Sequence, residues 1–220
     1  MENQAILSMR EISKSFPGTR ALNKVDFTLR KGEIHALMGE NGAGKSTLIK
    51  VLTGVYPKDG GHIFIDGVQG EAVIHSPQDA QNMGISTVYQ EINLCPNLTV
   101  AENLFIGRTK DARVHWRGNE KKADEILANL GIPAQANQEL SRCSLAVQQM
   151  IAIARAVDMN CKVLILDEPT SSLDDKEVQM LFGLMRGLKS RGVGIIFVTH
   201  FLEQVYEVSD RITVLRNGEL

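Results

Sequence analysis

Hydrophobic and polar residues alternate along the first thirty positions of the chain. The segments Ala5–Ile12 and Ala21–Leu29 follow this pattern, and the turn-like Phe16-Pro17-Gly18 lies between them. A period of two places the apolar side chains on one face of an extended chain, so both segments are predicted to be β-strands. Glu33–Met38 is a short apolar segment that is also typical of a strand, and the chain is therefore expected to begin as β structure.

Turn and helix-start residues separate the next fifty residues into predicted helices and strands. Asp66-Gly67 is a typical hairpin turn, and Ser76 before Pro77 is a typical helix start, with Ser76 as the N-cap. The elements predicted here are a helix from Lys45 to about Gly54, a strand at Gly60–Asp66, a helix that begins at Pro77 and a strand at Ile85–Tyr89.

The region from residue 98 to about residue 150 is helical in pattern. Thr99 and Glu102 predict a capping box for a first helix, Val100–Phe105, and Glu120–Leu130 has the spacing of a second. This region interrupts an alternation of strands and helices, so we expect a helical subdomain inserted into the main fold.

Strands and helices alternate again in the last third of the chain. Repetition of this kind predicts a mainly parallel sheet with helices on both faces, and hence an α/β fold. The predicted elements are the helix Ser144–Val157, the strand Lys162–Leu166, the helix Lys176–Arg191, the strand Gly194–Val198, the helix Phe201–Val208 and the strand Arg211–Arg216.

Composition narrows the function class only slightly. The 220 residues are 43% hydrophobic and 23% charged, with a formal net charge of −2. A dedicated nucleic-acid binder would carry a basic excess, so no nucleic-acid partner is expected. Apolar runs such as Val163–Leu166 and Val193–Val198 are far shorter than the roughly 20 residues of a membrane-spanning helix.

Targeting signals and cysteines indicate the compartment. The N-terminal residues lack the basic start and apolar run of a secretion signal. Cys95, Cys143 and Cys161 are scattered without a pairing pattern, as in a reducing compartment. We therefore expect the chain in the cytosol, with any membrane association through a partner.

A glycine-rich motif lies between a predicted strand and a predicted helix, the context that a phosphate-binding loop requires. Glycines let backbone N–H groups approach an anion without a Cβ in the way, and the N-terminus of the next helix adds further donors. Lys45 is suited to neutralise the β- and γ-phosphates, and Ser46 to bind Mg²⁺. The predicted nucleotide-binding residues are Gly39, Glu40, Asn41, Gly42, Ala43, Gly44, Lys45, Ser46 and Thr47.

Two carboxylates follow the apolar segment Val163–Leu166. Open α/β sheets bind ligands at the carboxyl ends of their strands, where Asp167 and Glu168 are predicted to lie. Asp167 is suited to hold Mg²⁺ directly or through water, and Glu168 to polarise an attacking water. Many strands end in an acidic pair, so Asp167 and Glu168 alone would be weak evidence for a nucleotide site. They become strong evidence because the same chain contains a phosphate-binding loop.

Beyond these two motifs, the order of landmarks along essentially the whole chain resembles the ATP-binding-cassette (ABC) ATPases. The resemblance implies a P-loop fold with a parallel core, an N-terminal antiparallel β subdomain and an inserted helical subdomain, in a single domain of residues 1–220. It also implies that Phe16 stacks on adenine, that Gln90 senses the γ-phosphate and Mg²⁺, and that His200 contacts the γ-phosphate. The alternatives are a core phenylalanine beside a turn, an ordinary strand-end glutamine and a histidine without function.

The family's signature, ideally Leu-Ser-Gly-Gly-Gln, reads Cys-Ser-Leu-Ala-Val at residues 143–147. Ser144 is retained at a helix start and is expected to face the ATP of a partner cassette. Leu145 adds bulk where backbone should approach an anion, so this half-site is expected to bind its partner's ATP poorly or to need a particular partner. The segment 169–174, which ends in Asp174, resembles the family's loop that crosses to the opposite cassette. Asp174 is equally suited to be the N-cap of the following helix.

Within the family, the chain most resembles the ATP-binding subunits of bacterial monosaccharide importers of the ribose, galactose and galactofuranose kind. Such subunits usually carry two cassettes, and this chain has room for one, so it is expected to be the N-terminal cassette of a longer protein. The resemblance implies a second cassette and transmembrane permease subunits as partners, a periplasmic sugar-binding protein acting indirectly, and a place on the cytoplasmic face of the bacterial inner membrane. The segments that carry it are Ser15–Gly18, Met38–Ser46, Val88–Glu91, Leu98–Phe105 and the signature region ending in Gln-Gln-Met.

The function expected is hydrolysis of Mg-ATP by phosphoryl transfer to water, coupled to uptake of a small solute. The alternatives are a non-transport cassette in DNA repair or on ribosomes, and a regulatory module that holds ATP without turning it over. The sequence between Gln90 and the signature has no sustained heptads, which disfavours the repair class. The expected catalytic residues are Lys45, Gln90, Glu168 and His200, and the expected Mg²⁺ ligands are Ser46, Gln90 and Asp167.

Overall fold

The computed structural model describes residues 4–91, 93–107 and 116–219. A three-stranded antiparallel sheet in the order β2-β1-β4 comes first. Its strands are β1 (Ala5–Phe16), β2 (Thr19–Arg30) and β4 (Gly60–Ile65). β1 and β2 extend beyond the predicted segments because their ladder continues to the pair Phe16 and Thr19 at the turn.

The second sheet has five parallel strands in the order β5-β6-β7-β3-β8. Its central strands are almost continuously apolar because both of their faces are buried. The predicted α/β fold with a parallel core and an antiparallel subdomain is confirmed. The strands are β3 (Ile34–Met38), β5 (Ile85–Val88), β6 (Val163–Asp167), β7 (Gly194–Val198) and β8 (Arg211–Val214).

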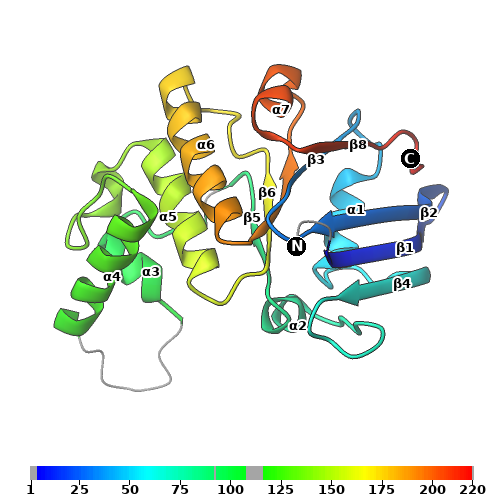
Figure 1. Ribbon diagram of the computed structural model, residues 1–220, viewed down its shortest axis with the longest axis horizontal. Coiled ribbons are helices and arrows are strands. Elements are labelled where there is room, and N and C mark those ends of the chain that lie inside the picture. Colours follow the sequence, from blue (N-terminus) through cyan, green and yellow to red (C-terminus); the bar gives the residue numbers. More distant parts are fainter. Residues whose placement is uncertain (1–3, 92, 108–115, 220) are drawn as a thin grey trace.

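Helices cover both faces of the parallel sheet (Figure 1). On one face, α1 (Lys45–Leu52) and the antiparallel sheet share an apolar cluster with Leu37 of β3. On the other face, Ala36 of the same strand belongs to a second cluster that includes residues of three later helices. These helices are α5 (Leu145–Val157), α6 (Asp175–Ser190) and α7 (Leu202–Val208).

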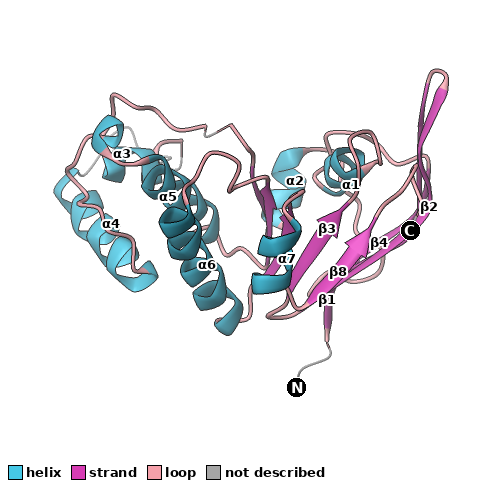
Figure 2. Ribbon diagram, turned by 90° about the horizontal axis from the view of Figure 1, so that it is seen from above, coloured by secondary structure: helices cyan, strands magenta, loops and turns pink. Residues whose placement is uncertain are grey.

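The helical region forms one end of the molecule, with α3 (Val100–Phe105) and α4 (Trp116–Leu130) beside α5 (Figure 2). The capping box at Thr99 and Glu102 is present as predicted, with both of its hydrogen bonds. Leu104 of α3 and Leu127 of α4 belong to the same apolar cluster as the sheet. The helical region therefore packs on the parallel core through a continuous hydrophobic interior.

The hairpin predicted at Asp66-Gly67 is wrong. No strand follows β4 in residues 67–76, all of which the structure describes. The N–H of Val68 donates to Ile65 O at 3.1 Å, and Ala72 N–H donates to Ile63 O at 2.7 Å. The segment contains a further glycine in the left-handed region, Gly70 with a φ of 75°, and it continues as bends and loop rather than as a strand, although Ala72 within it is buried.

The remaining predicted bounds shift by a few residues. β8 ends at Val214, short of Arg216, because the chain turns at Asn217-Gly218, both with positive φ. The helix after the predicted N-cap Ser76 is α2 (Pro77–Asn82), as its start signal indicated. Within the described residues, no helix is long and apolar enough to cross a bilayer.

Candidate nucleotide-binding site

Four neighbouring parallel strands end at one edge of the sheet, and each is followed by a predicted site segment. β3 leads into residues 39–46, β5 into Gln90, β6 into Asp167 and Glu168, and β7 into His200. The parallel registers align these ends, with Asp167 beside Val198. The topology thus collects residues from distant parts of the sequence at one crevice, where open α/β sheets bind ligands.

The loop between β3 and α1 has a backbone that depends on its glycines. Gly39, Gly42 and Gly44 have φ angles of 148°, 84° and 109°. A Cβ on Gly39 would lie 2.3 Å from Leu215 O, and a Cβ on Gly44 would lie 2.7 Å from Ala21 O. A Cβ on Gly42 would meet nothing within 4 Å, so backbone conformation alone requires glycine there.

Helix α1 begins at the end of this loop without a side-chain cap. Gly44 is its N-cap, and its first turn contains no acidic residue. Backbone N–H groups in a first helical turn have no acceptor within the helix, and the helix dipole makes this end positive. Ser46 is exposed and Thr47 half-buried in this turn. The loop and helix start together are suited to bind phosphate oxygens.

Lys45 places a positive charge inside the loop. The residue is 8% exposed, and its Nζ donates to the carbonyl oxygens of Gly39 at 2.6 Å and Glu40 at 3.1 Å. The hydrogen-bond partners of this buried ammonium are neutral carbonyls, so a bound anion would stabilise it further. Lys45 therefore adds a directed charge to the donors of the phosphate loop.

Asp167 is half-buried at the end of β6. Burial raises the pKa of its carboxyl group, and the charge of Glu168 raises it further. The ammonium groups of Lys45 and Lys50 act in the opposite direction, which shows that both lysines lie within electrostatic range of Asp167. Lys50, on α1, is a nearby positive charge that the sequence did not single out.

Glu168 turns the chain sharply away from β6. Its φ is 48°, in the left-handed region that side chains other than glycine rarely adopt. Its N–H donates to Val198 O at 2.9 Å, which ties this conformation to β7. Its Oε1 lies 3.3 Å from Nδ1 of His200, so the predicted pair of site residues is in contact. Strained residues of this kind cluster at functional sites.

The segment after Glu168 is held by a contact that the sequence did not reveal. Buried Thr170 donates its hydroxyl to Oε1 of Gln204 on α7 at 2.6 Å. Asp174 is the N-cap of α6, where it accepts from Glu177 N–H at 2.9 Å, so the N-cap interpretation of Asp174 is confirmed.

Of the other predicted residues, Phe16 and Ser144 lie on elements outside these strand ends, and Gln90 follows the strand β5. Half-buried Phe16 ends β1, and its ring contacts Tyr56. Gln90 is exposed two residues beyond β5. Ser144 is the N-cap of α5 and accepts from Val147 N–H at 3.4 Å, next to Leu145, which is 41% exposed. The roles assigned to these three residues remain predictions.

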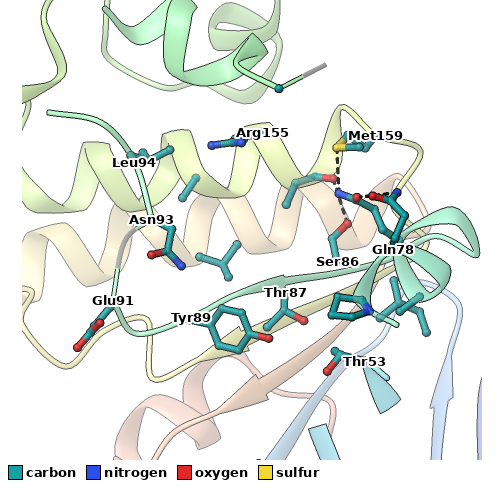
Figure 3. A pocket seen from close by; sticks show the side chains of 18 of the residues that line it. Thr53, Gln78, Ser86, Thr87, Tyr89, Glu91, Asn93, Leu94, Arg155 and Met159 are labelled. Carbon is teal, nitrogen blue, oxygen red and sulfur yellow. Dashed lines mark hydrogen bonds between the residues drawn. The ribbon is translucent and has the colours of Figure 1, made fainter. Parts of the chain in front are cut away.

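A second concavity lies between the parallel core and the helical region. Its volume is about 430 Å³, and it is open to solvent. Figure 3 shows Tyr89 just beyond β5 on one side of the cavity. On the other side lie Arg155 of α5 and Met159, just beyond the end of that helix, and the segment with Glu91 and Asn93 crosses between the two sides. Glu91 and Asn93, close after Gln90 in the sequence, therefore line a cavity formed by both parts of the molecule.

The donor set fits Mg²⁺ bound with a triphosphate rather than an all-protein metal site. Among the described residues, no cluster of three or more His, Cys, Asp or Glu side chains could hold a metal ion. Mg²⁺ in phosphate sites typically takes one or two protein oxygens and completes its shell with phosphates and water. The hydroxyl of Ser46 and the carboxylate of Asp167 would supply oxygen atoms of this kind.

A phosphate loop on β3, an acidic pair on β6 and a histidine on β7, joined to an antiparallel and a helical subdomain, define an ATP-binding cassette. The comparisons with known proteins agree. A family model described as ABC transporter matches residues 22–171. The chain therefore belongs to the ABC transporter family, as its landmarks indicated.

Relatives of known function are sugar transporter components. The galactofuranose transporter ATP-binding protein YtfR of Escherichia coli (strain K12) is 57% identical over 99% of this chain. The fructose import ATP-binding protein FruK of Bifidobacterium longum is 51% identical over 99%, and ribose import ATP-binding protein RbsA 1 of Streptomyces avermitilis is 47% identical over 97%. The chain spans 43%, 43% and 41% of the lengths of these relatives, less than half in each case.

Solved structures have the same fold. The ADP conformation of an ATP-binding cassette of an ABC transporter aligns with a TM-score of 0.86 at 26% identity, covering 99% of this chain and 89% of that one. A dimeric post-hydrolysis cassette bound to ADP and Pi aligns with a TM-score of 0.78 at 26% identity, covering 97% and 96%.

Proposed function

We propose that this chain is the ATP-hydrolysing cassette of a bacterial importer that takes up a monosaccharide. The observation that carries the proposal is the meeting of Lys45, Asp167, Glu168 and His200 at one edge of the parallel sheet. The relatives named for galactofuranose, fructose and ribose support a sugar as the solute.

The triphosphate is held by Lys45 and by the N–H groups of the loop and of the first turn of α1. Ser46, Asp167 and Gln90 would hold Mg²⁺, which would supply positive charge to the triphosphate. The protein contributes mainly fixed charges and dipoles, because phosphoryl transfer to water needs charge stabilisation more than covalent help. Burial of Lys45 makes that stabilisation stronger than it would be in water.

Glu168 and His200 position the attacking water. The carboxylate of Glu168 accepts a hydrogen bond from the water and polarises it, and His200 contacts the γ-phosphate while it orients Glu168 through Nδ1. Gln90 follows β5, the strand next to β6, and is placed to respond to the γ-phosphate and the metal. Phe16 stacks on adenine.

The functional unit contains two cassettes, and residues 1–220 form one of them, with residues 98–150 as its helical subdomain. Ser144 at the start of α5 faces the phosphates of the opposite cassette, and the 13-residue helix adds its N-terminal dipole. The dimeric ADP and Pi structure of a similar cassette supports this arrangement. ATP then acts as a ligand that favours the closed dimer, which hydrolysis reopens.

Transmembrane permease subunits dock at the cavity between the core and the helical region. An occupant there would touch Glu91 and Asn93, directly after Gln90, so nucleotide-dependent movement of Gln90 would reach the permease. The cassette therefore works at the cytoplasmic face of the inner membrane, and a periplasmic sugar-binding protein delivers the solute to the permease from the other side.

The test is phosphate release from ATP by the chain, with and without Mg²⁺, beside Glu168→Gln. Hydrolysis by the unsubstituted chain and a loss of about a hundredfold in Glu168→Gln, with ATP affinity retained, would support the proposal. Glu203→Gln, at an exposed glutamate of α7, is the matched control and should hydrolyse ATP normally. ATP binding without hydrolysis by the unsubstituted chain, even with a second cassette present, would favour the regulatory module instead.

A further inference from the structure

The ring of Phe16 packs against Tyr56, a residue outside both the phosphate loop and the acidic pair. The packing is edge-to-face, with the ring centroids 5.2 Å apart and an interplanar angle of 73°. Edge-to-face aromatic pairs are favourable beyond the area they bury, because a positive ring edge meets a negative ring face. The contact fixes the tilt of Phe16, which lies at the end of β1 where the chain turns.

The loop that follows Tyr56 also forms hydrogen bonds with β1, the strand that ends at Phe16. Asp59 accepts from Lys14 Nζ at 2.8 Å and from the backbone N–H of Ser15 at 2.6 Å. Its own N–H donates to Ser13 O at 2.9 Å. These hydrogen bonds lower the pKa of the Asp59 carboxyl, with the bond from Lys14 as the largest cause. Three consecutive residues before Phe16 are therefore attached to one loop.

That loop is itself an extension of the phosphate-binding helix. The N–H groups of Val55 and Tyr56 both donate to Lys50 O, at 2.9 and 3.0 Å, and Lys50 Nζ lies 5.3 Å from the Tyr56 ring centroid. Gly54 makes the turn with a φ of 72°. Helix α1 has eight residues and spans about 12 Å, with the phosphate loop at its start and Tyr56 beyond its end.

We propose that Tyr56 is a positioning residue of the nucleotide base site, which holds Phe16 at a fixed distance and angle from the phosphate loop. This inference rests on the proposed stacking of Phe16 on adenine. The phosphate loop follows a strand of the parallel sheet, whereas Phe16 ends a strand of the antiparallel sheet. Tyr56 and Asp59 lie just after α1 and contact the end of β1, so they link Phe16 to the helix that the phosphate loop begins. A base stacked on Phe16 and phosphates bound at α1 are then held by one connected unit, so less entropy is lost in ordering Phe16 when the nucleotide binds.

The test compares the binding of Mg-ATP with that of Mg-tripolyphosphate, which carries phosphates but no base, by calorimetry on the full chain. Tyr56→Ala should weaken ATP binding about three- to tenfold and leave tripolyphosphate binding unchanged. Tyr56→Phe keeps the ring and should bind both as the unsubstituted chain does. Tyr206→Ala removes a tyrosine that is 75% exposed on α7 and is the matched control.

The variant Phe16→Ala distinguishes the positioning role of Tyr56 from the stacking of adenine on Phe16. If Phe16→Ala weakens ATP binding and Tyr56→Ala adds nothing in that background, the two rings act as one unit. Unchanged ATP affinity in Phe16→Ala would overturn the base site itself. Normal ATP affinity in Tyr56→Ala, beside an impaired Phe16→Ala, would overturn the positioning role alone.

Asp59→Ala provides a variant that leaves both rings in place. Asp59 is exposed, and its removal frees Lys14 and Ser15 without opening a cavity. We expect a selective loss of ATP binding in the same direction and no larger than that of Tyr56→Ala. Equal losses of ATP and tripolyphosphate binding in both Tyr56→Ala and Asp59→Ala would show general damage to α1 and overturn the inference.

Discussion

The Nδ1 atom of His200 lies 3.3 Å from Oε1 of Glu168, across the ends of two adjacent parallel strands. The two residues are 32 positions apart in the sequence. The left-handed conformation of Glu168 and its backbone bond to Val198 O bring the carboxylate to this position. In the proposed mechanism, this contact gives His200 a second role besides contacting the γ-phosphate, which is to orient the carboxylate that polarises water.

Replacement of His200 should therefore act on turnover more than on binding. We expect His200→Ala to lower the rate of ATP hydrolysis about a hundredfold, because Glu168 loses its orienting partner, with ATP affinity changed much less. Steady-state phosphate release and calorimetric ATP binding measure the two quantities. His75→Ala, at an exposed histidine, is the control. Hydrolysis at the normal rate in His200→Ala would remove His200 from the mechanism.

Lys45→Ala should have the opposite profile. The variant loses the buried ammonium of the phosphate loop, and charge-assisted hydrogen bonds of this kind correspond to about ten- to a hundredfold in affinity. We expect ATP and tripolyphosphate to lose affinity together, because the interaction involves phosphates only. Lys176→Ala, at an exposed lysine of α6, should bind both normally. Equal ATP affinity in Lys45→Ala and the unsubstituted chain would contradict the role of Lys45.

The relaxed signature predicts a weak cassette dimer. In the Glu168→Gln background, where bound ATP persists, Leu145→Gly should increase the Mg-ATP-dependent dimer, with a dissociation constant lowered about tenfold. The physical reason is that removal of the exposed Leu145 side chain lets phosphates approach the first turn of α5. Solution mass with and without Mg-ATP measures the dimer.

Leu202→Gly controls for the cost of glycine at a helix start, since Leu202 is the first residue of α7 and is also exposed. It should leave the dimer unchanged. If Leu145→Gly remains monomeric while it still binds ATP, the bulk of Leu145 is not what limits dimer formation.

Because His35 is buried, we expect the protein to lose folding stability in acid. His35 lies between the sheets, where Nδ1 meets Thr28 O at 3.0 Å and Nε2 meets Thr213 Oγ1 at 2.8 Å. Burial, with the nearby charge of Arg211, lowers its pKa from 6.5 to about 4. The unfolded chain therefore takes up the proton first. Stability from this group is complete above pH 6.5 and is lost as the pH falls toward 4.

Urea unfolding across this pH range measures the effect. One proton of difference between the states gives a slope of at most about 1.4 kcal/mol per pH unit. His35→Gln should show a shallower pH dependence between pH 6.5 and 4, whatever its stability at neutral pH. His75→Gln should keep the slope of the unsubstituted chain. An unaltered slope in His35→Gln would contradict the assignment.

The predicted site residues that the structure brings together share one property. Gly39, Asp167 and His200 each follow an apolar strand, and parallel strands in one sheet end at the same edge. Local pattern was enough to predict the positions of Gly39 and Asp167, whereas the role of His200 was predicted from the resemblance to the family. The capping residues Ser76 and Thr99 were equally predictable, because a cap depends on neighbours within four positions.

The residues that the sequence did not reveal are those whose partners lie far along the chain. Tyr56 contacts Phe16, Thr170 bonds to Gln204, and no periodicity connects either pair. The hairpin predicted at Asp66-Gly67 is wrong for a related reason, since a turn signal specifies only the turn, and the path of the next segment depends on what it packs against.

The sequence by itself determined the phosphate loop, the strand-end carboxylates and the α/β class, because these depend on residue type, short spacing and hydrophobic period. Only the tertiary structure decided which side chains support them. The left-handed turn at Glu168 depends on the hydrogen bond to β7, and the position of Phe16 depends on a loop beyond α1. Such contacts follow from the packing of segments on one another, which local preference does not encode.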